Sequence, residues 1–162
     1  MFRPDPIPNP TLDPDTMEWT MTVHASLRHA LLLLLLLGGA SVQAQTVVIV
    51  STKNPVSKLT ADQLSQLFLG QATTYYSGGR AEPLDQPEGT SSRQEFYGKY
   101  LNKSQAQMKA YWSKLAFSGK GMSPMVLANS SEVVRKVAEN PKYISYVDKS
   151  AVDASVKVLT IQ

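Results

Sequence analysis

The stretch TVVIVSTKNPVSKLTADQLSQLFLG, residues 46–70, decides the fold class. Residues 46–50 form a short apolar run of β-branched side chains, which predicts a strand buried on both faces. Further along, Thr60 and Gln63 have the spacing of a capping box at the start of a helix. That helix carries an apolar stripe and ends at Gly70, because glycine is favoured just after the last turn. The stretch therefore predicts a strand followed by an amphipathic helix.

The same alternation of strands and helices continues toward the C-terminus. Further strands are expected at residues 81–84, 125–128, 143–147 and 156–161. Further helices are expected over residues 92–101, from Ser104 with a capping box at Gln107, and from Asn129 to the stop at Asn140-Pro141. Alternating strands and helical patterns favour an α/β layered domain, here with about four helices.

Upstream of this domain, seven consecutive leucines occupy residues 31–37. Basic residues precede them, and a small-residue cleavage motif ending at Ala44 follows, which is the pattern of a secretory signal peptide. We predict a signal peptide over residues 21–44 and a periplasmic protein that begins at Gln45. The alternative is an uncleaved membrane anchor behind a disordered cytoplasmic tail. A spanning helix needs about 20 apolar residues, and the apolar run here is about half that length.

Residues 1–20 fit neither the signal peptide nor the domain. They are rich in proline and acidic side chains, and we interpret them as a non-native or disordered leader. Met21 is the start that a signal peptide would have, with Met1 and Met17 as the other candidates. The domain organisation predicted is thus a leader at 1–20, a signal peptide at 21–44 and one domain at 45–162.

The composition of residues 45–162 excludes several classes of function. Cysteine is absent from the chain, and both histidines, His24 and His29, precede the expected cleavage site. A transition-metal site is therefore not expected, nor is a Cys or Ser-His nucleophile. The nine carboxylates show no catalytic spacing, so we expect neither an enzyme nor a cofactor. The domain carries 14 basic and 9 acidic residues, a net charge of +5 that favours small anions. The domain contains no run of basic residues, so we do not expect a nucleic-acid partner.

A candidate anion site lies where the helix at residues 92–101 begins. Gly89 is followed by three hydroxyl residues and an arginine, namely Thr90, Ser91, Ser92 and Arg93. The first N–H groups of a helix have no intrahelical partner and attract negative charge. The hydroxyls add donors, and arginine binds oxyanions in bidentate fashion. Glu88, or alternatively Asp85, is placed to accept a proton from a monoprotonated oxyanion.

Two competing interpretations of these loops involve helix capping alone. Ser92 and Glu95 have the spacing of a capping box, which would explain the hydroxyl without any ligand. The loop at residues 118–121, Ser-Gly-Lys-Gly, is either a second backbone concavity for an anion or the C-terminal cap of the preceding helix.

Several short segments also stand in an order that is typical of one family. They are Asn54-Pro55-Val56, Gln66-Leu67-Phe68-Leu69-Gly70, Thr90-Ser91-Ser92-Arg93-Gln94-Glu95-Phe96, Phe117-Ser118-Gly119-Lys120-Gly121 and Ile144-Ser145-Tyr146-Val147. In this order they resemble the phosphate ABC-transporter substrate-binding proteins, of the periplasmic binding protein type II superfamily. The resemblance implies an α/β lobe with a mixed sheet, phosphate or a similar oxyanion as ligand, and an ABC-transporter permease as partner.

The chain departs from the family pattern at three positions and in length. Ser91 and Ser145 stand where the family has glycine, and Asp85 stands where fuller relatives carry an arginine. The family's proteins have two lobes that close on the anion, whereas residues 45–162 resemble one lobe. Our leading hypothesis is a single lobe that binds phosphate. The alternative is an interaction module that has lost tight ligand binding and docks on an envelope protein or on itself as a homodimer.

Overall fold

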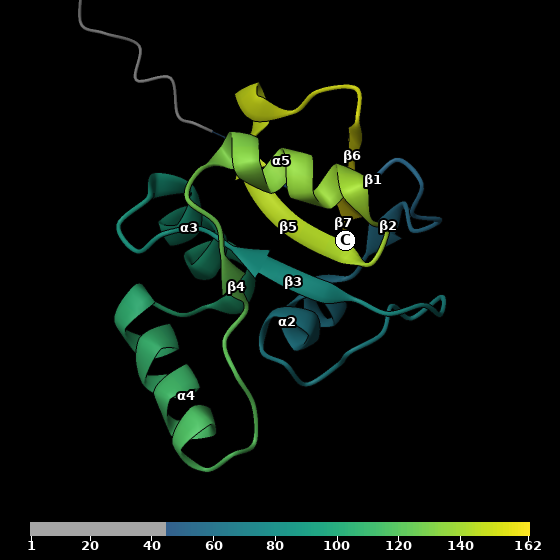
Figure 1. Ribbon diagram of the computed structural model, residues 1–162. Helices are drawn as coiled ribbons and strands as arrows, with labels where there is room; N and C mark the ends of the chain where they lie inside the picture. Colours follow the sequence, from purple (N-terminus) through teal and green to yellow (C-terminus); the bar gives the residue numbers. More distant parts are fainter. Residues whose placement is uncertain (1–44) are drawn as a thin grey trace, which may run out of the picture. The chain divides into compact units, whose positions relative to one another are not determined.

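The computed structural model describes residues 45–162, so the predicted leader and signal peptide lie outside the described residues. The elements, in chain order, are β1 (Thr46–Ser51), β2 (Lys58–Leu59), α2 (Ala61–Phe68), β3 (Glu82–Asp85), α3 (Ser91–Phe96), the π-helical turn η1 (Tyr97–Leu101), α4 (Gln105–Phe117), β4 (Met125–Val126), α5 (Ser130–Glu139), β5 (Tyr143–Asp148), the 3-10 turn η2 (Lys149–Ala151), β6 (Val156–Val158) and β7 (Thr160–Ile161) (Figure 1). No helix in this part of the chain is long and apolar enough to cross a membrane.

The main sheet has five strands in the order β4-β3-β5-β1-β6. Strands β4, β3 and β5 are parallel, whereas β1 runs antiparallel to both β5 and β6. A separate parallel pair joins β2 to β7. The sheet is therefore mixed, and the predicted α/β class is confirmed, with four α-helices within residues 45–162.

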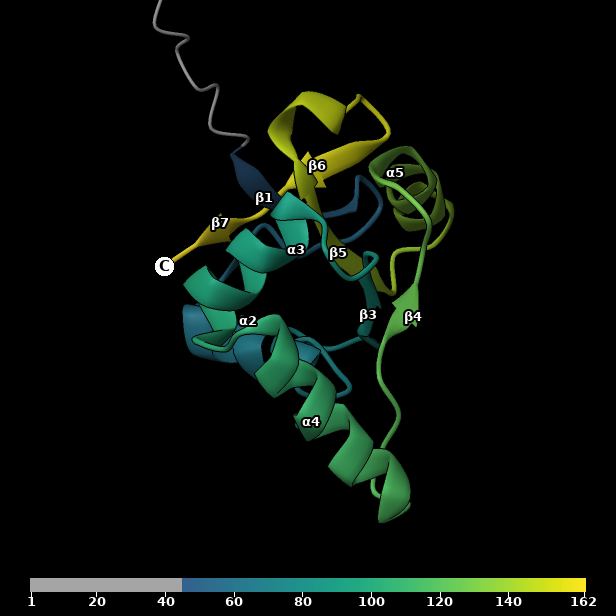
Figure 2. The same cartoon turned by 90° about the vertical axis from the view of Figure 1, so that its left-hand side faces the viewer.

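The two faces of the sheet bury two separate hydrophobic clusters. Alternate residues of β1 divide between them: Val48 and Val50 face the larger cluster, and Ile49 faces the smaller one. Helices α2, α3 and α4 supply the larger cluster, whereas α5 supplies three valines to the smaller one. Figure 2 shows α5 on one side of the strands and α2, α3 and α4 on the other. Because both faces of β1 are covered, its continuous apolar run is explained.

Three helices begin as the sequence predicts. Capping boxes join Thr60 to Gln63 and Ser104 to Gln107, and the Asn129 side chain accepts the N–H of Glu132. The loop after α4 is the predicted C-terminal cap, since Gly119 has φ +66° and the Lys120 N–H reaches back to the Leu115 carbonyl at 2.9 Å.

Two predicted elements differ from the structure. The helix expected over residues 92–101 is α-helical only to Phe96 and then widens into the π turn, which ends at Asn102 with φ +50°. The strand expected over residues 156–161 is two strands in different sheets. The break comes at Leu159, whose N–H still bonds to the Val48 carbonyl at 2.8 Å while its side chain is buried.

Replacement of Gly70 with alanine is expected to destabilise the fold by about 1–2 kcal/mol. Gly70 has φ +68°, and an added Cβ would lie 2.9 Å from Cη2 of Trp112. Gly98, inside η1, is the matched control, because it lacks a positive φ and no atom lies near an added Cβ. Urea unfolding of both variants tests this, and an equal effect of the two substitutions would contradict it.

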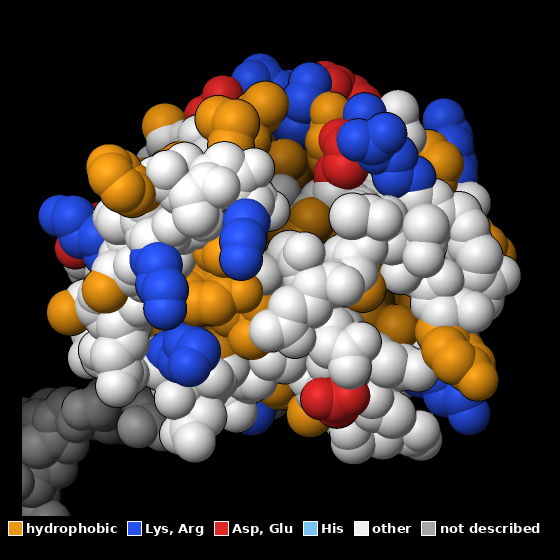
Figure 3. All heavy atoms as spheres, turned by 90° about the horizontal axis from the view of Figure 1, so that it is seen from below, with side chains coloured by type: hydrophobic (Ala, Val, Ile, Leu, Met, Phe, Trp, Pro, Cys, Tyr) orange, Lys and Arg blue, Asp and Glu red, His pale blue; other side chains and the backbone are white. Residues whose placement is uncertain are grey.

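Large apolar side chains are exposed in the segment from the end of α4 to β4. Phe117 is 97% exposed and Met122 is 86% exposed, and Met125 and Val126 of the edge strand β4 are more than half exposed. Figure 3 shows the lower face of the molecule, where hydrophobic side chains gather among Lys and Arg side chains. Exposed large apolar side chains concentrated in one segment favour a contact surface there.

Candidate oxyanion site at the start of helix α3

Helix α3 begins directly after a tight loop that follows β3. The loop turns at Gly89, which has φ +91° and donates its N–H to Oε1 of Gln105 in α4 at 2.9 Å. The Thr90 N–H and hydroxyl both bond back to the Pro87 carbonyl, at 3.3 and 3.0 Å. Hydrogen bonds within the loop and one to α4 therefore hold the loop in place, and this fixes where α3 starts.

The N-terminus of α3 has no side-chain cap. Thr90 occupies the N-cap position in extended conformation, but its hydroxyl bonds to Pro87 rather than to the helix. The N-cap side chains of α2, α4 and α5 each accept a helix N–H. The first N–H groups of α3, those of Ser91, Ser92 and Arg93, thus lack the side-chain acceptor that the other helices have.

The proposed capping box of Ser92 and Glu95 is wrong. Ser92 lies inside α3 rather than at its N-cap. The Glu95 carboxylate instead accepts hydrogen bonds from the N–H and hydroxyl of Thr46, at 3.2 and 2.7 Å, and so ties α3 to the start of β1. The spacing was correct for a cap, but the tertiary contact with β1 takes the carboxylate.

The five predicted site residues lie close in sequence but differ in surroundings. Ser91 is exposed at the first position of α3, and Ser92 is buried behind it. Glu88 is exposed on the loop, with its carboxylate 3.9 Å from the Lys109 ammonium of α4. Thr90 is half-buried, and its hydroxyl donates into the loop.

Arg93 points inward and pairs with a buried carboxylate. Its Nη2 lies 3.2 Å from Oδ2 of Asp85, and the two side chains are only 14% and 3% exposed. Its Nε donates to the Tyr97 hydroxyl at 3.1 Å, and its guanidinium lies over the Tyr97 ring. An anion that approaches the start of α3 therefore meets an arginine whose charge is already balanced by Asp85.

Two tyrosine hydroxyls complete the surroundings of Asp85. Tyr97 donates to Oδ2 at 2.5 Å, and Tyr146 of β5 donates to Oδ1. Burial, and secondarily the charge of Asp85, raise the pKa of both tyrosines well above the ordinary value. Both hydroxyls therefore stay protonated and act as donors to the carboxylate.

This cluster was missed at the sequence level, although part of its signal was present. Arg93 and Tyr97 are four residues apart, a spacing that places them on one helix face. Tyr146 lies 61 residues from Asp85, and only the parallel pairing of β3 with β5 brings them together. No local pattern indicates that contact.

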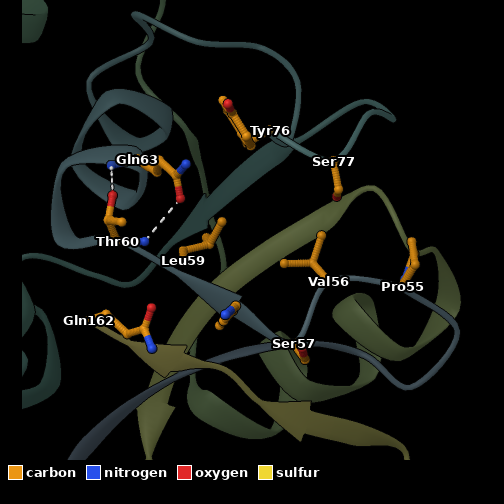
Figure 4. Close-up of a pocket in the computed structure, with 10 residues that line it drawn as sticks. Pro55, Val56, Ser57, Leu59, Thr60, Gln63, Tyr76, Ser77 and Gln162 are labelled. Carbon is orange, nitrogen blue, oxygen red and sulfur yellow. Dashed lines mark hydrogen bonds between the residues drawn. The ribbon is translucent and has the colours of Figure 1, made fainter.

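A separate pocket of 360 Å³ lies between the β2 region and the tip of the loop at Tyr76 (Figure 4). Its lining includes Thr60 and Gln63, whose polar groups are already joined in the α2 capping box. None of the five predicted residues lines it. Over residues 45–162 there is also no group of three or more His, Cys, Asp or Glu side chains that could hold a metal ion.

Several solved structures with a similar fold are described as phosphate transport or phosphate-binding proteins. They include an ABC-type phosphate transport receptor from Vibrio cholerae (19% identity, TM-score 0.51, covering 72% of this chain and 45% of that one). A second is a protein assigned as a phosphate ABC transporter substrate-binding protein, with bound phosphate, from Clostridium perfringens (20%, 0.59, 72% and 44%). A third is PstS from Borrelia burgdorferi (14%, 0.55, 72% and 47%).

These comparisons define the fold class of residues 45–162. No family model matches the chain, and no curated protein matches its sequence. The chain spans less than half the length of the solved proteins it resembles. It resembles, in a short single-lobe form, the phosphate ABC-transporter substrate-binding proteins, and at these identities the likeness concerns the fold.

Proposed function

We propose that this protein is an exported, solute-binding-type lobe that binds phosphate or a similar oxyanion at the N-terminus of α3. One observation carries the proposal: α3 starts without a side-chain cap and presents its first N–H groups beside an exposed serine. Uncapped helix N-termini favour anions through their donors and the helix dipole. The fold shared with phosphate transport receptors supports the same conclusion.

Each residue of the proposed site has a role. Ser91 and Ser92 supply N–H and hydroxyl donors to the oxyanion. Thr90, which was predicted to do the same, donates both its N–H and its hydroxyl to the Pro87 carbonyl and so fixes the loop instead. Arg93 contributes its backbone N–H, because its guanidinium is held by Asp85, and Glu88 accepts a proton from a monoprotonated ligand. No bond of the ligand is made or broken, so the protein binds and does not catalyse. Cleavage after Ala44, periplasmic location and delivery to an ABC-transporter permease belong to the same proposal.

The test is a thermal-shift series of the purified protein against phosphate, sulfate and chloride. Phosphate at 100 times its dissociation constant adds about 2.7 kcal/mol of stability, a rise on the order of 10 °C in a domain of this size. Ser91→Asp should lower phosphate affinity at least about tenfold, because it places a negative charge where the oxyanion binds. The new carboxylate also interacts favourably with the N-terminal end of the helix dipole, so the substitution should not lower the stability of the fold.

Ser131→Asp is the matched control. Ser131 is exposed in the first turn of α5, so the substitution makes the same charge change at another helix N-terminus. It should leave the phosphate response unchanged. If Ser91→Asp and Ser131→Asp respond to phosphate alike, the site is not at α3.

The second candidate function, an interaction module, is favoured by the exposed apolar side chains between residues 117 and 126. In that case the lobe docks on an envelope protein or forms a homodimer through this surface. The thermal-shift series distinguishes the two functions when it is combined with analytical ultracentrifugation, which measures the mass of the protein in solution. No shift at millimolar phosphate, together with the mass of a dimer, would favour the interaction module.

A further inference from the structure

Asp85 stands at the end of β3 inside a set of four donors. Its Oδ1 accepts the Tyr146 hydroxyl and the Gln86 N–H, the latter at 2.9 Å. Its Oδ2 accepts the Tyr97 hydroxyl at 2.5 Å and lies 3.2 Å from Nη2 of Arg93. The residue is 2% exposed, so these four donors replace its hydration.

Three of the four donors are also held by contacts that do not involve the carboxylate. Phe96 stacks on the Tyr146 ring, with centroids 4.0 Å apart and planes 7° apart, and also contacts Tyr97. The Gln86 side chain donates to the Tyr146 carbonyl at 2.8 Å and so anchors the backbone whose N–H faces Asp85. Packing and backbone geometry therefore help to place these three donors around one carboxylate-sized anion, and the Tyr97 hydroxyl in turn accepts a hydrogen bond from Arg93.

We propose that Asp85 is an internal ligand: its carboxylate fills a preformed anion site under α3 and holds Arg93 there, away from external oxyanions. The ligand class of this cradle is a small monocarboxylate, because two donors serve each oxygen of one planar carboxylate. The inference does not depend on phosphate binding at the start of α3. It identifies Asp85 as the residue that determines whether Arg93 is available to a free anion.

The test removes the carboxylate and supplies it again from solution. Asp85→Ala lacks one CO₂⁻ group, and formate is the smallest molecule that restores it. At constant ionic strength, sodium formate should raise the melting temperature of Asp85→Ala by about 5 °C relative to sodium chloride. The native protein should change by no more than about 1 °C, since its cradle is occupied.

Three further variants make the test specific. Asp85→Asn retains a side chain that fills the cradle, so formate should give no rescue. Tyr97→Phe in the Asp85→Ala background removes one donor, so the formate shift should become smaller. If Asp85→Ala fails to fold in chloride, the expected result is recovery of the folded state in formate, measured by tyrosine and tryptophan fluorescence, with Asp85→Ser as the second variant.

The opposing outcomes are also defined. A formate response of Asp85→Ala equal to that of the native protein would overturn the proposal. Failure of both Asp85→Ala and Asp85→Ser to fold in formate would overturn it as well. Neither outcome bears on the phosphate response of the native protein, which is measured separately, so the failure of one proposal is distinguishable from the failure of the other.

Discussion

Replacement of Arg93 with alanine is expected to lower the free energy of unfolding by about 3–5 kcal/mol. The guanidinium is the cation that faces the buried Asp85 carboxylate, at 3.2 Å. Without it, Asp85 keeps its burial but loses its counter-charge, and the Tyr97 hydroxyl loses the donor that now bonds to it at 3.1 Å. Removal of one member of a buried pair is costly because the other charge stays uncompensated.

Arg80→Ala is the control for this prediction. Arg80 also pairs with a carboxylate, Glu82, at 2.7 Å, but the arginine side chain is 74% exposed. Exposed pairs of this kind contribute about 0–1 kcal/mol. Chemical unfolding of both variants gives the comparison. A loss of less than about 1 kcal/mol for Arg93→Ala would contradict the prediction that the buried pair supports the fold. Because Arg93 supports the fold, Ser91→Asp is the cleaner variant for binding.

The second large effect is expected at Phe96, where alanine should cost about 3–5 kcal/mol. Phe96 is fully buried where α3 meets the sheet. Its ring stacks on Tyr146 and lies 4.6 Å, centroid to centroid, from Phe68 of α2. Truncation would leave a cavity between three elements and remove the ring that positions the Tyr146 hydroxyl on Asp85.

Phe117→Ala is the matched control, since Phe117 is 97% exposed at the end of α4. The same change in side-chain volume should alter stability there by no more than about 0.5 kcal/mol. Calorimetric melting of both variants checks the prediction. Comparable losses at the two positions would mean that the aromatic cluster under α3 is not the centre of the core.

Much of the fold was predictable because its signals are local. The β1 run, the capping side chains Thr60, Ser104 and Asn129, and Gly70 each specify their element from neighbours in the sequence. The exceptions depend on distant contacts. Glu95 had capping-box spacing, yet it bonds to Thr46, 49 residues away.

The candidate site was predictable only in part, for the same reason. The glycine and hydroxyl residues at the start of α3 are visible in the sequence, and the structure does place Ser91 at an exposed helix start. The partner of Arg93 was not predicted, because Asp85 joins it only through the turn between β3 and α3. Tyr146 reaches Asp85 only because β5 pairs with β3, and no short motif in the sequence indicates that pairing.

The central claim is that an oxyanion binds at the start of α3, and amide NMR tests it most directly. Isotope-labelled protein would be titrated with phosphate, with chloride at matched ionic strength as the reference. We predict saturable shifts of the amide signals of residues 89–93, with Ser91 and Ser92 among the largest, and no such shifts in Ser91→Asp. Unchanged amide signals for residues 89–93 at millimolar phosphate, or saturable shifts confined to another part of the domain, would contradict the account.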